Sequence, residues 1–150
     1  MGHLIGTSTA EIDAPLDQVW ALVQDVETAP SWQGGLNSVT ALDRDGEGRA
    51  TRCEVGADMK VRTVKTIVRF NYDAGPQRLT WSQEKGDLKS VDSSWELEDL
   101  GDGRTRATYN VDADLGRVLG ALVRGPVESA IRNMLAGARA GELKARVEAG

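Results

Sequence analysis

The sequence predicts an α+β domain in which an antiparallel sheet of six or seven strands is covered by one long C-terminal helix. Three observations carry this prediction. Apolar residues alternate with a period of two from Leu36 to Asp112, as half-buried strands require. Short turn sequences separate these segments, which favours antiparallel neighbours. The amphipathic stretch Val127–Val147 then follows, and it is the only element long enough to cover the apolar face of such a sheet.

The 150 residues correspond to one domain, residues 1–150, with 40% hydrophobic and 27% charged residues. Eighteen basic and 23 acidic residues leave a formal charge of −5, so we expect no nucleic-acid partner. The longest apolar run, Val118–Val123, is too short to span a membrane. The single cysteine, Cys53, excludes an internal disulfide and a multi-cysteine metal site. Without a secretory signal, we expect a cytoplasmic domain that carries no metal or cofactor.

The N-terminal part begins with a strand, Leu4–Ile12. Asp13 and Pro15 then form a helix start, with a capping side chain followed by proline near the first helical position. A second short helix over Asp25–Ala29 ends at Pro30. The first helix has one apolar face, formed by Leu16, Val19, Trp20 and Val23.

Six further strands follow. Their expected ranges are Leu36–Leu42, Ala50–Val55, Lys60–Tyr72, Gln77–Gln83, Leu88–Glu98 and Thr105–Asp112. Turn residues separate most of them, at Asp45-Gly46, Ala74–Pro76, Lys85–Asp87 and Gly101–Gly103.

One register explains both faces of the last hairpin. Pairing Glu98 with Arg104 also pairs Glu96 with Arg106, which places opposite charges across from each other on one face. The same parity in the last two hairpins predicts an apolar face made of Leu79, Trp81, Val91, Ser93, Trp95, Leu97, Thr105, Ala107, Tyr109 and Val111.

The strand Lys60–Tyr72 can present either of two faces to the core. We favour the inward set that contains Val64, Thr66, Val68, Phe70 and Tyr72. The opposite choice would bury Lys65 and Arg69, for which the sequence offers no evident anionic partners.

Two helices follow the last strand. The first is a short amphipathic helix over Leu115–Arg124, and Gly125-Pro126 separates it from the long helix. Leu143 and Val147 lie nearly opposite the apolar stripe of the long helix, so either they pack on another element or the helix changes phase near Gly137 and Gly141. The stripe itself consists of Val127, Ile131, Met134, Leu135 and Ala138, continued by Gly141 and Ala145.

Short motifs occur in a characteristic order along the whole chain. They are Ile12–Pro15, Val19-Trp20, Asp25, Pro30–Trp32, Gly75–Trp81, Ser94–Leu97 and Gly103–Arg106. In this order and spacing the sequence resembles the START-like helix-grip (SRPBCC) superfamily, in its polyketide cyclase/dehydrase and lipid-transport-like branch. The resemblance implies a strongly curved sheet wrapped around the long helix, with a deep apolar cavity between them. It also implies binding of lipids, sterols, polyketides or hormones, with some members acting as cyclases or hydrolases.

The resemblance makes the inward aromatic side chains candidates for a pocket wall, where a tyrosine hydroxyl could orient a polar group of the ligand. The loop that contains Trp32 would lie near the cavity mouth. Small residues of the helix stripe, Ala138, Gly141 and Ala145, would leave room beside the sheet; the alternative is a filled core. The expected ligand-binding residues are Trp32, Val68, Phe70, Trp81, Trp95, Tyr109, Leu119, Met134 and Leu135.

Groups suited to catalysis are scarce. The only histidine, His3, lies next to the N-terminus, where we expect fraying, and the familiar hydrolase and zinc motifs are absent. In aromatase/cyclase members, the resemblance implies a cavity arginine late in the strand Lys60–Tyr72. Val68 or Phe70 occupies the matching place here. We therefore assign no catalytic residue, with Tyr109 and Arg69 as weak candidates.

The expected function is non-enzymatic binding or carriage of a hydrophobic small molecule of lipid, polyketide or other aromatic or isoprenoid type. The segment Leu115–Pro126 could serve as a lid. One alternative is a polyketide aromatase/cyclase or dehydratase, whose discriminating residue is Arg69. A second is a protein-interaction or stress-response module with a filled core, which an exposed apolar patch around Val118 and Leu122 would favour. The identity of the ligand and the oligomeric state stay open.

Overall fold

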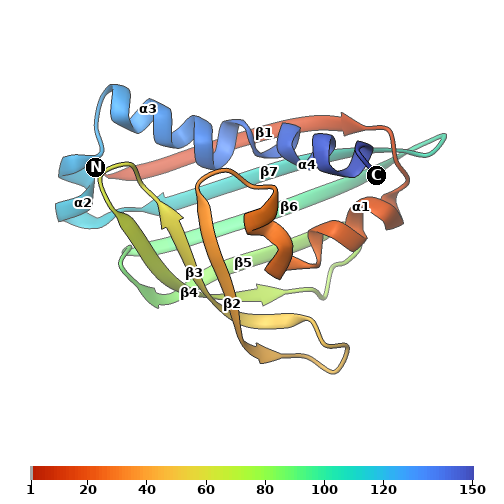
Figure 1. Ribbon diagram of the computed structural model, residues 1–150, viewed down its shortest axis with the longest axis horizontal. Coiled ribbons are helices and arrows are strands. Elements are labelled where there is room, and N and C mark those ends of the chain that lie inside the picture. Colours follow the sequence, from red (N-terminus) through yellow and green to blue (C-terminus); the bar gives the residue numbers. More distant parts are fainter. Residues whose placement is uncertain (1) are drawn as a thin grey trace.

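The structure is a computed structural model that describes residues 2–150 (Figure 1). Its elements in chain order are β1 (His3–Ile12), α1 (Leu16–Val23), η1 (Val26–Ser31), β2 (Leu36–Arg44), β3 (Ala50–Asp58), β4 (Thr63–Asn71), β5 (Arg78–Gly86), β6 (Ser90–Gly101), β7 (Arg104–Asp114), α2 (Gly116–Leu122), α3 (Pro126–Arg132), η2 (Asn133–Gly137) and α4 (Arg139–Glu148). The strands form one antiparallel sheet in the order β1-β7-β6-β5-β4-β3-β2. This sheet curves around the C-terminal helical segment, which confirms the predicted helix-grip architecture (Figure 1).

The inward and outward faces of β4–β7 are as the sequence predicts. Trp95 in β6 lies opposite Tyr109 in β7, and both side chains are buried. In β4 the buried residues include Val64 and Val68, whereas the side chain of Arg69 is 63% exposed. Because a charged side chain without a buried partner is costly to desolvate, the apolar set of β4 faces the core.

The predicted register of the last hairpin is wrong by two residues. Glu98 lies opposite Arg106, and Arg106 Nη1 donates to Glu98 Oε1 at 2.7 Å. The ladder is irregular between Asp99 and Gly101, so that Gly101 and not Glu98 pairs with Arg104. A shift of two leaves every side chain on its predicted face, because the side-chain period of a strand is two.

The C-terminal helix changes phase, which resolves the alternative left open by the position of Leu143. The segment η2 is a π-helical turn, and the N–H of Ala138 donates to Asn133 O at 2.8 Å. One extra residue in this turn rotates everything after it, so the buried residues of α4 are Arg139, Ala140, Leu143 and Val147. The expectation that Gly141 and Ala145 face the sheet is wrong, because both are exposed.

Two local expectations near the N-terminus are also wrong. His3 is not frayed, because it pairs with Asp114 in the ladder between β1 and β7. The side chain of Asp13 does not cap α1, whose N-cap is Pro15; instead the backbone N–H of Asp13 donates to Glu148 Oε2 at 2.9 Å. This bond ties the start of α1 to the end of α4.

The core has two parts. The larger lies between the sheet, α1 and α4, and includes Val19, Leu79 and Leu143. The smaller lies at the opposite end of the sheet, under α2, and includes Leu4 and Leu119. Among residues 2–150, no helix is long and apolar enough to cross a bilayer.

Candidate ligand-binding site

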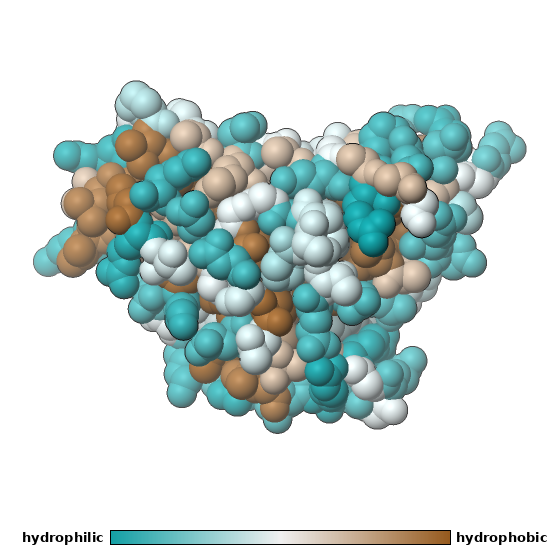
Figure 2. Space-filling view, in the orientation of Figure 1, coloured by the Kyte–Doolittle hydropathy of each residue, from teal (hydrophilic) through white to brown (hydrophobic). Residues whose placement is uncertain are grey.

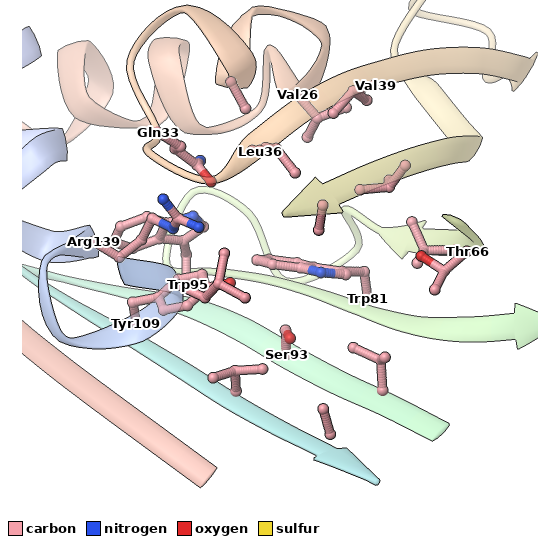
Figure 3. A pocket seen from close by; sticks show the side chains of 18 of the residues that line it. Val26, Gln33, Leu36, Val39, Thr66, Trp81, Ser93, Trp95, Tyr109 and Arg139 are labelled. Carbon is pink, nitrogen blue, oxygen red and sulfur yellow. The ribbon is translucent and has the colours of Figure 1, made fainter. Parts of the chain in front are cut away.

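A cavity of about 140 Å³ lies between the two parts of the core. The inner face of the sheet forms its floor, and the end of α1, η1, the loop after η1 and the C-terminal helical segment contribute the rest of the wall (Figure 3). Two of its lining residues are charged: Asp25, which is exposed, and Arg139, which is buried. The cavity is therefore an apolar chamber with one buried cationic side chain.

Most of the residues that the sequence predicts for the site line this cavity. Leu119 does not: it is buried in the smaller part of the core and contributes to a separate surface hollow under α2. Met134 also lies outside the wall and packs beside Gly35. The predicted residues that line the cavity are Trp32, Val68, Phe70, Trp81, Trp95, Tyr109 and Leu135.

Aromatic rings form a continuous series along the wall. Successive ring centroids are 5.4 Å apart for Phe70 and Trp81, 5.9 Å for Trp81 and Tyr109, and 4.8 Å for Tyr109 and Trp95. Trp32, on the loop after η1, extends the series with its centroid 6.3 Å from that of Trp95. Tilted pairs at these separations contribute about 0.5–1.5 kcal/mol each beyond the burial of their area, so the rings stabilise one another in the wall.

Arg139 provides the polar end of the cavity. Its Nη1 donates to Gly34 O at 2.9 Å and to Glu142 Oε1 at 2.8 Å, and only 2% of the residue is exposed. Glu142 Oε2 accepts the backbone N–H of Gly34 at 2.8 Å. We call this arrangement the Arg139–Glu142 clamp, since it joins α4 to the loop after η1. Figure 3 shows Arg139 beside Tyr109 and Trp95, across from Gln33.

Sequence reasoning did not identify Arg139. An uninterrupted α-helical stripe centred on Val127, Ile131, Ala138 and Ala145 places position 139 at its edge and not at its centre. The available signal was the misplaced pair Leu143 and Val147, because a change of helix phase that turns them inward also turns Arg139 inward.

Tyr109 lies directly beside this guanidinium. Arg139 Cζ is 5.7 Å from the centroid of the Tyr109 ring. Burial raises the pKa of the Tyr109 phenol, and the neighbouring side chains of Arg139 and Ser93 only partly oppose that rise. Tyr109 is therefore a neutral phenol near pH 7, able to donate a hydrogen bond but not to act as a base.

Arg69 faces away from the cavity. Its Nε lies 2.7 Å from Glu84 Oε1 on the outer face of the sheet, and hydrogen bonds from Arg52 are the largest cause that lowers the pKa of Glu84 to about 2. Cys53 does not line the cavity, and burial raises the pKa of its thiol to about 11. The cavity wall thus offers apolar contact, ring stacking and hydrogen-bond donors.

Comparison with known proteins places the chain among proteins of the same architecture. A family model described as polyketide cyclase/dehydrase and lipid transport matches residues 4–148. No curated protein matches the sequence significantly.

Three solved structures illustrate the likeness of fold. A START superfamily protein from Mycobacterium smegmatis superimposes with a TM-score of 0.81 at 21% identity, over 99% of both chains. A protein from Thermus thermophilus gives 0.78 at 20% identity, over 97% of both chains. The Zhui aromatase/cyclase from a Streptomyces species gives 0.78 at 17% identity, over 97% of this chain and 94% of that one. At these identities the likeness shows the fold alone.

Proposed function

Because the chain belongs to the family of polyketide cyclases/dehydrases and lipid-transport proteins, we propose that it binds and carries a hydrophobic small molecule in the cavity between the sheet and the C-terminal helix. The observation that carries this proposal is the cavity beside a continuous series of aromatic rings. Aromatic and aliphatic walls with a few polar groups are typical of small-molecule sites.

The energetics of the cavity support a bound occupant. At about 24 cal/mol per Å³, a dry empty space of 140 Å³ costs on the order of 3 kcal/mol. That cost is a large part of a typical domain stability of about 5–15 kcal/mol. A ligand that fills the space with apolar contacts would recover much of it.

The volume also bounds the ligand. An apolar space of about 150 Å³ accommodates one benzene ring, and sites for drug-sized ligands occupy roughly 300–1,000 Å³. With 140 Å³, the cavity suits a single ring or a short alkyl chain. A lipid or multi-ring polyketide would require the wall to open.

We propose that α2 covers one end of the cavity and acts as the lid. Leu115 lines the cavity and Leu119 is buried beneath α2. Gly116, the first residue of α2, and Gly125, which follows the helix, have φ angles of +79° and +61°, a conformation that glycine adopts without strain. Opening at these two positions would admit a larger ligand.

The two alternatives receive less support. A cyclase would use a cavity arginine on β4, but Arg69 is in solvent. An interaction module would expose an apolar patch, and Val118 and Leu122 are indeed 74% and 54% exposed at the end where Figure 2 shows apolar atoms gathered. The cavity of about 140 Å³ favours the binding proposal over this alternative, which requires a filled core.

Native mass spectrometry of the freshly purified protein, compared with the denatured mass, tests the proposal. We expect extra mass that disappears on denaturation, or binding of small aromatic and short-chain probes. Ala113→Leu places a larger side chain in the wall and should abolish binding, whereas Ala145→Leu, on the exposed face of α4, should not. Bare protein that binds no probe, or equal binding by both variants, would refute the proposal.

A further inference from the structure

Two buried hydrogen-bond donors of the cavity have no partner. Within residues 2–150, three buried side-chain polar atoms make no hydrogen bond: Trp32 Nε1, Arg139 Nε and Gln83 Oε1. The first two are N–H donors of residues that line the cavity, whereas Gln83 does not line it. Buried N–H donors in native proteins almost always have a hydrogen-bond acceptor. Two donors without an acceptor among the residues of one cavity therefore indicate that a bound ligand supplies the acceptors.

The hydrogen bonds of Arg139 leave its Nε without a partner. Both of its hydrogen bonds, to Gly34 and to Glu142, leave from Nη1. The guanidinium is planar and presents five N–H groups in a fixed fork, and its Nε–H has no acceptor within residues 2–150. Paired N–H groups on one edge match the two oxygens of a carboxylate.

The second donor belongs to the loop that Arg139 contacts, because Trp32 lies two residues before Gly34, the acceptor of Arg139 Nη1. Arg139 sits over the ring of Tyr109, Tyr109 packs on Trp95, and Trp95 packs on Trp32. The neutral Tyr109 phenol adds a third polar group to this cluster. The opposite end of the cavity, beside Leu4, is apolar.

Arg139 is the one cationic residue among the described residues that line the cavity. Glu142, whose side chain is 24% exposed, pairs with the guanidinium through Oε1 and accepts the backbone N–H of Gly34 through Oε2. The remaining charged residue of the wall, Asp25, is exposed to solvent. An ionised acceptor on Arg139 Nε would form a shorter and stronger hydrogen bond than a neutral one.

We propose that the ligand is a small amphipathic carboxylic acid, with a single ring or short chain along the aromatic wall and its carboxylate on Arg139 Nε and Trp32 Nε1. This proposal rests on the proposed function, because it specifies the ligand class of the same cavity. It selects acids over esters, alcohols and hydrocarbons of the same shape.

Titration calorimetry at pH 7 with matched probes tests this selection. The probes are 3-phenylpropionate and octanoate, each compared with its methyl ester. For the wild type we expect the acids to bind at least about tenfold more tightly than the esters, the factor that one charge-assisted hydrogen bond provides. Equal affinity of acid and ester would overturn the carboxylate and leave the proposed function standing, whereas failure of all four probes to bind would overturn both.

Variants locate the carboxylate. Arg139→Met should abolish the preference for the acid while the ester still binds. Arg132→Met, which removes the guanidinium that donates to Ile5 O on the surface, should preserve it. Because Arg139→Met also breaks the clamp, Trp32→Phe provides a milder test: it keeps a ring and removes only the N–H, and should lower acid affinity several-fold without changing ester affinity. A preference unchanged in both Arg139→Met and Trp32→Phe would overturn the proposal.

Discussion

Replacing Glu142 with alanine should destabilise the protein by about 3 kcal/mol, the lower end of the range of about 3–5 kcal/mol for breaking a buried ion pair. The side chain of Arg139 is 3% exposed and lies 2.8 Å from the Glu142 carboxylate. Removing that carboxylate leaves a buried guanidinium with only the Gly34 carbonyl and also deprives the Gly34 N–H of its acceptor. We choose the lower end because Glu142 is 24% exposed, so water partly replaces it.

A second ion pair on the same helical segment provides the control. Arg132 and Glu128 lie 3.4 Å apart at i,i+4 spacing, and their side chains are 38% and 35% exposed. Glu128→Ala should therefore cost at most about 0.5 kcal/mol. The double replacement Arg139→Met with Glu142→Ala should cost less than Glu142→Ala alone, because it removes the uncompensated charge as well as its partner.

Equilibrium unfolding in guanidinium chloride at neutral pH measures these three differences, provided that the dependence on denaturant keeps the same slope. Equal losses for Glu142→Ala and Glu128→Ala would refute the reasoning, since they would mean that the Arg139 charge is already solvated. A double variant less stable than Glu142→Ala would refute it too.

Three further outcomes follow from burial and charge. With its pKa raised to about 11, Cys53 should resist Ellman's reagent at mildly alkaline pH until the protein unfolds, and rapid native reaction would contradict its burial. Hydrogen bonding from Arg52 lowers the pKa of Glu84 from 4.5 to about 2. Ionised Glu84 therefore stabilises the fold at pH values above its pKa in the unfolded chain, and this stabilisation is lost as the pH falls toward 2. In urea titrations, Glu84→Gln should lose less stability than the wild type between about pH 5 and pH 2. Leu119 is 6% exposed, so Leu119→Ala should lower the free energy of unfolding by about 2–4 kcal/mol in thermal unfolding. Val118 is 74% exposed, so Val118→Ala should lower it by at most about 0.5 kcal/mol. Similar losses for the two variants would contradict the placement of α2.

The inward faces of β4–β7 could be predicted from the sequence because an error of two residues in the register of a strand leaves the same side chains facing inward. The hairpin of β6 and β7 shows this, since Glu98 pairs with Arg106 and not with Arg104. The even shift moved no side chain to the other face, so Trp95 and Tyr109 still point inward. The wall residues of β4–β7 follow from this parity, whereas the sequence analysis assigned no face to the wall residues of β1–β3.

The helical part of the wall could not be predicted in the same way. Each residue of an α-helix turns the side-chain direction by about 100°, so a single irregular residue redirects all that follow. Met134 lies within the π turn and Leu119 lies on a separate short helix, and neither reaches the cavity. The hydrophobic periodicity of the sequence does not show where a π-helical turn adds an extra residue to a helix.

The π turn and the polar end of the cavity have the same origin. In an uninterrupted helix, Ala138 and Gly141 would follow Leu135 toward the sheet, and the wall there would consist of small apolar residues. The extra residue in Asn133–Gly137 instead turns Arg139 inward, where the loop after η1 and Glu142 hold it against Tyr109. Single π turns within α-helices are frequent at functional sites. The π turn therefore has two effects: it makes this part of the wall unpredictable from hydrophobic periodicity, and it places the cationic side chain of Arg139 in the cavity wall.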